Sequence, residues 1–330
     1  MDRKKELEHW LIRVLPKRPF TLSTASADAS FRRYFRVHLE NETLIAMDAP
    51  PQLENCQLFV DVDRLFLACG LHVPEIVAQD LEQGFLLLSD LGSKTYLSEL
   101  TKDNAQSMYG DATNALIKLQ LASKPGILPN YDAAMLMREM QLFIDWYIAK
   151  HLNIQLSDAQ QAVLQKTFAV LTDNIVHQSQ VYVHRDYHAR NLMVCDNNPG
   201  ILDFQDAVYG AITYDLVSLL KDAYIGWEEA EMMDWVVRYW DAARKVQLPV
   251  PRDFSEFYRD FEWMGAQRHI KVLGIFARLS HRDGKDGYLK DMPLVMDYLR
   301  RVCGRYLELR PMLKLLNTLQ GYEEKAGYTF

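Results

Sequence analysis

The segment from Val181 to Phe204 constrains the fold more than any other part of this 330-residue chain. It contains the run His184-Arg185-Asp186-Tyr187-His188-Ala189-Arg190-Asn191, bounded by the short apolar runs 181–183 and 192–195. A polar turn at 196–200 leads to the run 201–204, which contains Asp203. Such runs predict short β-strands within a region that is otherwise helical by periodicity. Loops held between rigid strands are common places for catalytic groups.

The spacing in this segment predicts a metal site. If 192–195 and 201–204 pair as a hairpin, the turn places Asp203 beside Asn191, the residue before the first strand. A carboxylate oxygen and an amide oxygen would then point at one cation. Mg²⁺ prefers these ligands, and nucleotide phosphates and water would complete its coordination.

Asp186 stands five residues before Asn191, at the start of the same loop. There it could accept a hydroxyl proton and align the oxygen for in-line attack. Phosphoryl transfer needs this combination of a base or orienting group, a metal and fixed positive charge. We therefore predict that Asp186 is catalytic and that Asn191 and Asp203 bind the metal, whereas His184 has a structural role.

The first 90 or so residues have the pattern of a small β-rich lobe with one main helix. A helix is expected over 3–14, and strands within 31–37, 43–47, 73–79 and 85–89. The apolar spacing over 58–69, followed at once by Gly70, predicts the main helix of this lobe. Residues 88–92 are predicted to be the linker, so we expect an N-terminal lobe at 1–90 and a C-terminal lobe at 93–330.

The C-terminal lobe is predicted to be larger and mostly helical. Helices are expected at 103–122, 132–152, 157–177, 213–225, 227–246, 253–281 and 290–316. The predicted fold class is therefore α+β with two lobes.

Composition excludes several classes of protein. Hydrophobic residues make up 49% of the chain and charged residues 25%, which is typical of a globular protein. The net charge of -7 disfavours a nucleic-acid partner. The four cysteines form no C-x-x-C pair, and the chain has neither an N-terminal apolar leader nor an apolar run long enough for a membrane span. We expect a cytoplasmic protein with reduced thiols and no membrane partner.

The H-R-D-x-x-x-x-N pattern followed by Asp203-Phe204 resembles the catalytic and metal-binding loops of the protein-kinase fold. It departs from protein kinases in the short distance between Asn191 and Asp203, in Gln205 where D-F-G has glycine, and in the lack of A-P-E. It looks like the aminoglycoside phosphotransferase and choline kinase branch, which phosphorylates small molecules. This resemblance implies the two-lobed kinase-like fold, with ATP and Mg²⁺ as cofactors.

Other segments resemble a bacterial subgroup, the anomeric N-acetylmuramate/N-acetylglucosamine kinases of cell-wall recycling. The matching runs are 27–35, 47–51, 203–207, 214–220 and 267–279. The resemblance implies transfer of phosphate to the anomeric hydroxyl, giving an α-1-phosphate, with an amino sugar as the partner and a monomeric enzyme. Two alternatives stay open: a kinase of an aminoglycoside or choline-like alcohol, and a pseudokinase that binds nucleotide or a protein without catalysis.

The resemblance also implies a nucleotide site. The run Ser26-Ala27-Asp28-Ala29-Ser30 stands where a phosphate-covering hairpin is expected, and its small residues allow a close approach of backbone N–H groups. The run 43–47 lacks the lysine usual on the third strand, so Arg32 or Arg33 could supply the charge, with Glu54 as an acidic partner. Only one of these neighbouring arginines can face a given side of a strand. Adenine is expected near Leu88, Asp90 and Leu91.

The acceptor site is harder to predict, because aromatic and charged residues at helical spacing are more often structural. A sugar needs planar apolar faces and hydrogen-bonding groups, and an arginine could pair with the carboxylate of N-acetylmuramate. We predict Asp215 as a structural brace for the catalytic loop, near a helix start. The predicted acceptor-binding residues are Arg190, Asp222, Tyr224, Trp227, Arg268 and His269.

Overall fold

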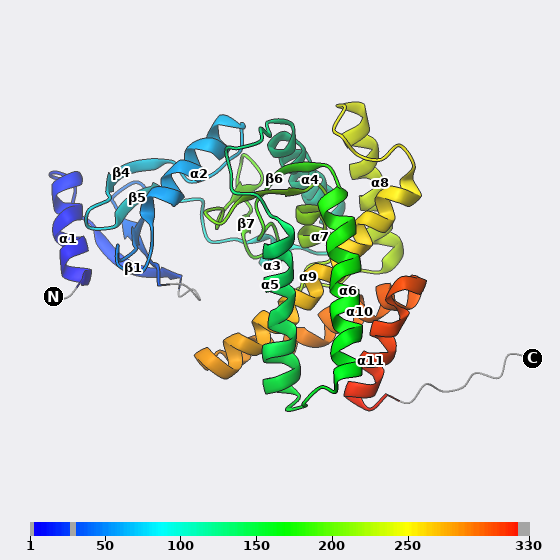
Figure 1. Ribbon diagram of the computed structural model, residues 1–330. Coiled ribbons are helices and arrows are strands. Elements are labelled where there is room, and N and C mark those ends of the chain that lie inside the picture. Colours follow the sequence, from blue (N-terminus) through cyan, green and yellow to red (C-terminus); the bar gives the residue numbers. More distant parts are fainter. Residues whose placement is uncertain (1–2, 27–30, 323–330) are drawn as a thin grey trace, which may run out of the picture. The chain divides into compact units, whose positions relative to one another are not determined.

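The computed structural model describes residues 3–26 and 31–322 (Figure 1). These residues form two compact units. The first contains the described residues up to Leu119 together with Arg190–Asp206, and the second contains Gln120–Ala189 together with the described residues from Ala207 onward. The predicted linker at 88–92 lies inside the first unit, and its role as a lobe boundary stays a prediction.

A five-stranded antiparallel sheet forms the centre of the first unit. Its strands are β1 (Thr21–Ser26), β2 (Arg33–His38), β3 (Thr43–Asp48), β4 (Ile76–Asp80) and β5 (Phe85–Ser89), in the order β1-β2-β3-β5-β4. The buried strand β5 lies between β3 and β4, which agrees with its continuous apolar sequence. The predicted β-rich character of this region is therefore confirmed.

Helices α1 (Arg3–Val14) and α2 (Cys56–Ala68) belong to the same unit as this sheet. The apolar residues Leu7, Trp10 and Leu11 of α1 share a core with Phe35, Val37, Leu44, Ala46, Phe85 and Leu87 of the sheet. The strand residues in this core alternate along the sequence because successive side chains of a strand point to opposite faces.

The first unit also contains a short hairpin of β7 (Leu192–Met193) and β8 (Gly200–Ile201), with α3 (Tyr96–Glu99) and most of α4 (Ala105–Leu121). The hairpin is joined to its surroundings by two isolated bridges, Thr95 with Met193 and His72 with Gly200. The polar segment 190–206 is thereby fixed to the sheet-containing unit.

The second unit is mostly helical, as predicted. Its helices are α5 (Ala133–Leu142), η1 (Phe143–His151), α6 (Asp158–His177), α7 (Tyr214–Leu220), α8 (Glu229–Lys245), α9 (Phe254–Asp283), η2 (Asp286–Asp291), α10 (Met292–Arg305), η3 (Leu307–Leu309) and α11 (Arg310–Gln320). Strands β6 (Gln180–Val183) and β9 (Val208–Ala211) pair antiparallel. Helix α9 packs against α5, η1, α6, α7 and α10, so it is the central helix of this unit (Figure 1).

Three predicted helices differ in the structure. The helix predicted over 213–225 ends at Leu220. The helix predicted over 132–152 is an α-helix only to Leu142 and continues as the π-helix η1. At this junction α9 comes close: a Cβ added to Gly274 would lie 2.5 Å from the carbonyl carbon of Leu142. The helix predicted over 290–316 breaks at Tyr306, because Pro311 would clash with a carbonyl one turn earlier and instead lies in the first turn of α11.

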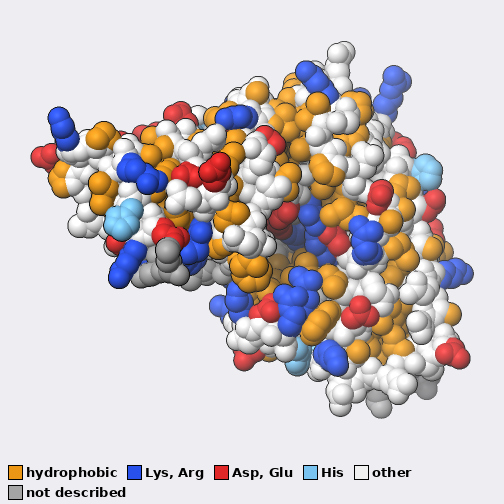
Figure 2. Space-filling model, turned by 60° about the vertical axis from the view of Figure 1, so that its left-hand side comes forward, with side chains coloured by type: hydrophobic (Ala, Val, Ile, Leu, Met, Phe, Trp, Pro, Cys, Tyr) orange, Lys and Arg blue, Asp and Glu red, His pale blue; other side chains and the backbone are white. Residues whose placement is uncertain are grey.

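Side chains of both charge signs are interspersed over the face shown in Figure 2. None of the helices in the described ranges is long and apolar enough to cross a membrane. The four cysteines form no disulfide bond with one another in the structure.

Candidate active site

The predicted metal ligands lie beside the β7–β8 hairpin of the first unit. Leu192 pairs with Ile201, and the backbone N–H of Leu202 donates to the carbonyl oxygen of Asn191 at 2.9 Å. Leu202 therefore stands opposite Asn191, and the predicted register with Asp203 in that place is wrong by one residue. Strand β8 ends at Ile201, earlier than predicted, and the chain leaves the β conformation at Asp203, whose φ is 63°.

The two side chains are nevertheless adjacent. The Nδ2 atom of Asn191 donates to Oδ2 of Asp203 at 3.3 Å, and Nε2 of Gln205 donates to Oδ1 of Asp203 at 2.9 Å. A positive φ is uncommon for a residue other than glycine, and such conformations concentrate at functional sites. The next residue, Phe204, is buried against Phe59 and Phe66 of α2, with ring centroids 4.9 Å and 5.6 Å away. This packing fixes the backbone that carries Asp203.

The donor set of this pair fits Mg²⁺. Asp203 offers a carboxylate and Asn191 an amide oxygen, and Mg²⁺ is usually held by one or two protein groups together with phosphates and waters. Over residues 3–26 and 31–322, no group of three or more His, Cys, Asp or Glu side chains could hold a metal. A site that relies on few protein ligands agrees with that finding.

In the second unit, the first half of the motif forms a braced loop after β6. The carboxylate of Asp215 accepts hydrogen bonds from the backbone N–H groups of His184 at 2.6 Å and Arg185 at 3.0 Å. Nδ1 of the buried His184 accepts from the backbone N–H of Asp186 at 3.2 Å. Arg185 has a φ of 78°, an unfavourable conformation that these contacts hold in place. A structural role for His184 and Asp215, as predicted, requires such hydrogen bonds to the backbone of the loop.

A charged network extends from this loop. Glu139 of α5 forms ion pairs with Arg185 and, at 3.2 Å, with Lys271 of α9. Nζ of Lys271 also donates to the hydroxyl of Tyr214 at 3.0 Å. Burial opposes ionisation of Glu139, but Lys271 and Arg185 lower the pKa of this carboxyl below its usual value. The network keeps two buried cations beside the loop.

Asp186 lines a pocket within the second unit, with a volume of about 130 Å³. The lining includes charged side chains together with aromatic and aliphatic ones. The lining residues are Asp186, His188, Tyr214, Ala223, Tyr224, Arg268, Lys271, Val272, Ile275, Phe276, Leu279 and Tyr288. Concave sites of this mixed character are typical places for small ligands.

The charge of Asp186 is stabilised by its neighbours. Burial opposes its ionisation, but the positive charges of Lys271, His188 and Arg268 hold the pKa of this carboxyl below its usual value. An ionised carboxylate can accept a hydrogen bond from a hydroxyl group and orient it. Burial raises the pKa of Asp215 to about 7, although the bonds from His184 and Arg185 favour its ionised form.

The predicted acceptor-binding residues separate into two groups. Arg268 and Tyr224 line the Asp186 pocket. Asp222, Trp227 and His269 lie outside its lining: Asp222 accepts hydrogen bonds from the backbone N–H groups of Ala189 at 2.9 Å and Tyr224 at 3.0 Å.

Trp227 contacts Trp235, with ring centroids 5.3 Å apart, and it lines a separate small cavity with Lys221. The ring of His269 stacks on Tyr298 at 5.2 Å. Arg190 lies in the first unit, so it is not part of the pocket described in the second unit.

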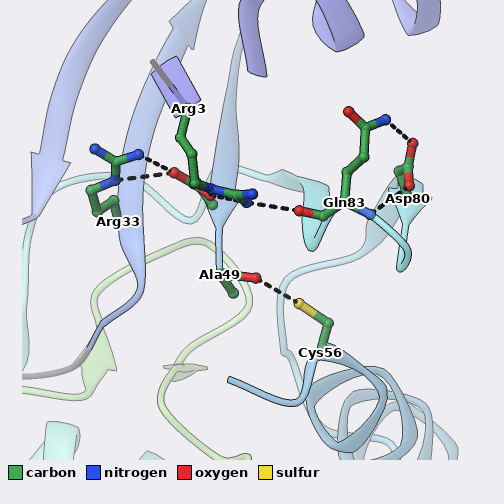
Figure 3. A network of polar contacts seen from close by, with 7 residues as sticks. Arg3, Arg33, Ala49, Cys56, Asp80 and Gln83 are labelled. Atoms are coloured by element: carbon green, nitrogen blue, oxygen red, sulfur yellow. Dashed lines mark hydrogen bonds and ion pairs between the residues drawn. The ribbon is translucent and has the colours of Figure 1, made fainter. Parts of the chain in front are cut away.

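The two arginines considered for the nucleotide have different partners. Arg32 forms an ion pair with Glu54 at 2.7 Å, just before α2, which is the partner predicted for such an arginine. Arg33 contacts Asp48 through Nε at 3.0 Å, and Arg3 of α1 contacts the same carboxylate at 2.9 Å. Figure 3 shows Arg3 and Arg33 in this network. The two neighbouring arginines therefore have different partners.

The remaining nucleotide-binding predictions fall on the β1–β2 connection and on β5. Ser26 ends β1, and residues 27–30 lie outside the described residues. Leu88 is buried in β5, paired with Ile45 of β3.

After β5, the carboxylate of Asp90 binds Arg36 at 2.6 Å and accepts from the N–H of Gly92 at 2.9 Å, so it fixes the turn after the strand. The side chain of Leu91 lies against Gly200 of the β7–β8 hairpin.

Sequence reasoning missed Glu139 and Lys271. Lys271 follows Arg268 by three positions on α9, so the two residues occupy one face of the helix. Two cations on a face that is otherwise apolar could have indicated a functional site. Glu139 lies on α5, and its distance along the chain from either cation gave no sequence signal.

Comparison with known proteins identifies the family of this chain. A family model described as the phosphotransferase enzyme family matches residues 21–257. The N-acetylmuramate/N-acetylglucosamine kinase of Neisseria meningitidis serogroup B is 46% identical over 336 residues, covering 100% of both chains. The protein of that name from Pseudomonas putida is 48% identical over 300 residues, covering 91% of this chain and 88% of that one.

Solved structures share the fold at low identity. The choline kinase LicA from Streptococcus pneumoniae has a TM-score of 0.65 at 13% identity, covering 91% of this chain and 99% of that chain. The ADP-bound aminoglycoside phosphotransferase APH(2'')-Ib has a TM-score of 0.61 at 16% identity, covering 90% and 98%. The predicted kinase-like fold is thereby confirmed.

Proposed function

Because the chain belongs to the phosphotransferase enzyme family, we propose that it is an ATP-dependent amino-sugar kinase. It phosphorylates the anomeric hydroxyl of N-acetylmuramate and N-acetylglucosamine to the α-1-phosphate, as part of cell-wall recycling. The observation that carries this proposal is the 46–48% identity, over nearly the whole chain, to relatives named N-acetylmuramate/N-acetylglucosamine kinase. The proposal includes a monomeric enzyme in the cytoplasm.

Asp186 is the group that acts on the acceptor in this proposal. Its carboxylate lines the second unit's pocket and is held ionised by Lys271, His188 and Arg268. It accepts a hydrogen bond from the sugar hydroxyl and orients the oxygen for in-line attack on the γ-phosphorus of ATP. It takes the proton as the new O–P bond forms, while the bond from the γ-phosphorus to the bridging oxygen breaks and ADP leaves. The aromatic side chains Tyr224 and Tyr288 offer apolar faces to the sugar ring.

Asn191 and Asp203 are the groups that would hold Mg²⁺. When bound, this ion neutralises charge on the nucleotide phosphates during transfer. The contact between the two side chains, and the anchoring of Phe204 against α2, support this assignment.

Arg32 is the cation that we assign to the nucleotide phosphates. Kinases of this fold use a lysine paired with a glutamate of the following helix, and here the third strand ends in Met47 and Asp48. The ion pair between Arg32 and Glu54 provides a similar pairing from the start of β2.

An ADP-release assay with a panel of acceptors tests the proposal. N-acetylmuramate and N-acetylglucosamine should support Mg²⁺-dependent ADP release, whereas aminoglycosides and choline should not. Release with an aminoglycoside or choline alone would establish one of the alternative acceptors. If no acceptor supports release and Asp186→Ala changes nothing, the chain is not a kinase.

A further inference from the structure

One buried cation in the Asp186 pocket lacks partners for part of its side chain. Arg268 lies on α9, is only 4% exposed and lines the pocket. Its Nε and Nη1 atoms are buried, and within residues 3–26 and 31–322 they have no hydrogen-bond partner. A buried N–H group without an acceptor costs about 1–3 kcal/mol. A ligand that supplied an acceptor would remove that cost.

The other fixed cations of this region are already paired. Lys271 contacts Glu139 at 3.2 Å and donates to Tyr214 at 3.0 Å. Arg185 pairs with the same glutamate. Gln267 and His269, the neighbours of Arg268 on α9, also have unpartnered buried atoms, but neither lines the pocket. Arg268 therefore combines unused buried donors with access to the pocket.

The ligand that suits these donors carries an anionic oxygen on a small, partly apolar molecule. A guanidinium N–H donates a charge-assisted hydrogen bond to a carboxylate or phosphate oxygen. The aromatic and aliphatic walls of the pocket suit the less polar body of such a ligand. Of the two proposed acceptors, N-acetylmuramate carries a carboxylate and N-acetylglucosamine carries none.

We propose that Arg268 binds the carboxylate of N-acetylmuramate and thereby sets the preference of the enzyme between its two acceptors. This inference rests on the proposed function. It makes Arg268 a specificity-determining residue, whereas Asp186 in the same pocket acts on the hydroxyl that both acceptors share.

The same donors could instead meet an anionic oxygen of the nucleotide phosphates. The acceptor carboxylate and the nucleotide phosphate would affect the two substrates differently. A contact with the acceptor carboxylate is absent when N-acetylglucosamine is the substrate, while a contact with phosphate is present for both substrates. The comparison of the two acceptors therefore separates them.

The experiment measures kcat/KM for both acceptors in the wild type, in Arg268→Gln and in Arg278→Gln. Arg278 is a matched control, because it also lies on α9 with a buried, unpartnered Nε and does not line the pocket. Arg268→Gln should lower kcat/KM for N-acetylmuramate by about 30–100-fold, mostly through KM, which is the loss expected for a charge-assisted contact. The loss for N-acetylglucosamine should be about 3-fold or less, and Arg278→Gln should leave both values unchanged.

A substrate-side measurement keeps the test valid if Arg268→Gln folds poorly. For the wild type, kcat/KM should be lower for the carboxamide of N-acetylmuramate than for N-acetylmuramate itself. In Arg268→Lys, the difference in kcat/KM between the acid and the amide should be smaller. An equal loss for both acceptors in Arg268→Gln, or no preference of the wild type for the acid over the amide, would overturn the inference and leave the kinase proposal intact. If the wild type phosphorylates neither amino sugar, the proposed function itself is wrong.

Discussion

Two buried charge clusters, one in each unit, differ in how completely their side chains are paired. In the first unit, the fully buried Asp48 binds both Arg3 and Arg33, so α1 is fastened to the sheet (Figure 3). In the second unit, Arg268 keeps unpartnered donors in a pocket that also contains Asp186. A buried charge whose partners are all protein groups depends on them, because removing one partner destabilises the fold. One that faces a pocket with unused bonding capacity indicates a ligand.

The largest effect expected from this comparison is on catalysis. Asp186→Asn should lower kcat by about 10²–10⁴-fold, because an amide cannot take the hydroxyl proton. Nucleotide binding should change little, since the carboxylate acts on the acceptor. Steady-state turnover and the dissociation constant of the ATP–Mg²⁺ complex measure the two effects separately.

Asp48→Asn is the matched change in the first unit. It should destabilise the protein by about 1.5–3 kcal/mol, through weaker bonds to Arg3 and Arg33, and leave kcat unchanged. If Asp186→Asn behaves like Asp48→Asn, with loss of stability and near-normal turnover, the distinction between the two clusters is wrong.

The metal pair should give the next largest effect. Asp203→Ala should weaken Mg²⁺-dependent nucleotide binding by about 10–100-fold, because it removes a charged oxygen ligand. Titration of ATP at several Mg²⁺ concentrations measures this loss. Binding that is as tight as in the wild type at every Mg²⁺ concentration would remove Asp203 from the metal site.

Arg32 and Arg33 provide a comparison within one strand region. Arg32→Gln should lower kcat/KM for ATP by about 10-fold, which is the worth of one charge-assisted contact. Arg33→Gln should lower the thermal unfolding temperature without that kinetic loss, since its partner is Asp48. Equal kinetic losses in the two variants would mean that the ion pair with Glu54 does not identify the nucleotide-binding arginine.

The smallest expected effect concerns Asp63, a carboxyl in α2 that is 1% exposed and has no hydrogen-bond partner in the described part of the chain. Burial raises its pKa to about 7. The unfolded chain loses this proton near pH 4, so the folded state is destabilised progressively as the pH rises from about 4 to about 7. Asp63→Asn should therefore stabilise the protein by about 1–2 kcal/mol at pH 8 and by much less at pH 4.5.

Thermal or urea unfolding at the two pH values checks this expectation. Asp61→Asn is the matched control, because Asp61 is exposed on the same helix and accepts a hydrogen bond from Gln57. It should show no gain that depends on pH. A gain of the same size at both pH values would mean that Asp63 is not neutral in the folded protein near pH 6.

Local sequence signals predicted much of the fold and part of the site. Periodicity located α1, α6 and α9, and the H-x-D-x-x-x-x-N spacing identified the loop that carries Asp186. The adjacency of Asn191 and Asp203 followed from a hairpin, although the register was wrong by one residue. A positive φ at Asp203 compensates for that shift, and alternation along a strand cannot predict it.

Some contacts between distant elements could not be predicted. Nothing near Glu139 indicates that it holds Arg185 and Lys271, because the three residues lie on separate elements. Asp222, Trp227 and His269 have side chains typical of sugar sites, but none of the three lines the Asp186 pocket. Residue type narrows the candidates for an acceptor site, and tertiary packing selects among them.

A phosphorus NMR spectrum of the product tests the central claim most directly. Purified protein is incubated with ATP, Mg²⁺ and each amino sugar, and the product is examined before and after mild acid treatment. The account predicts a sugar α-1-phosphate from both acceptors, which acid hydrolyses to inorganic phosphate. An acid-stable phosphate on another hydroxyl, or no phosphorylated sugar at all, would contradict it.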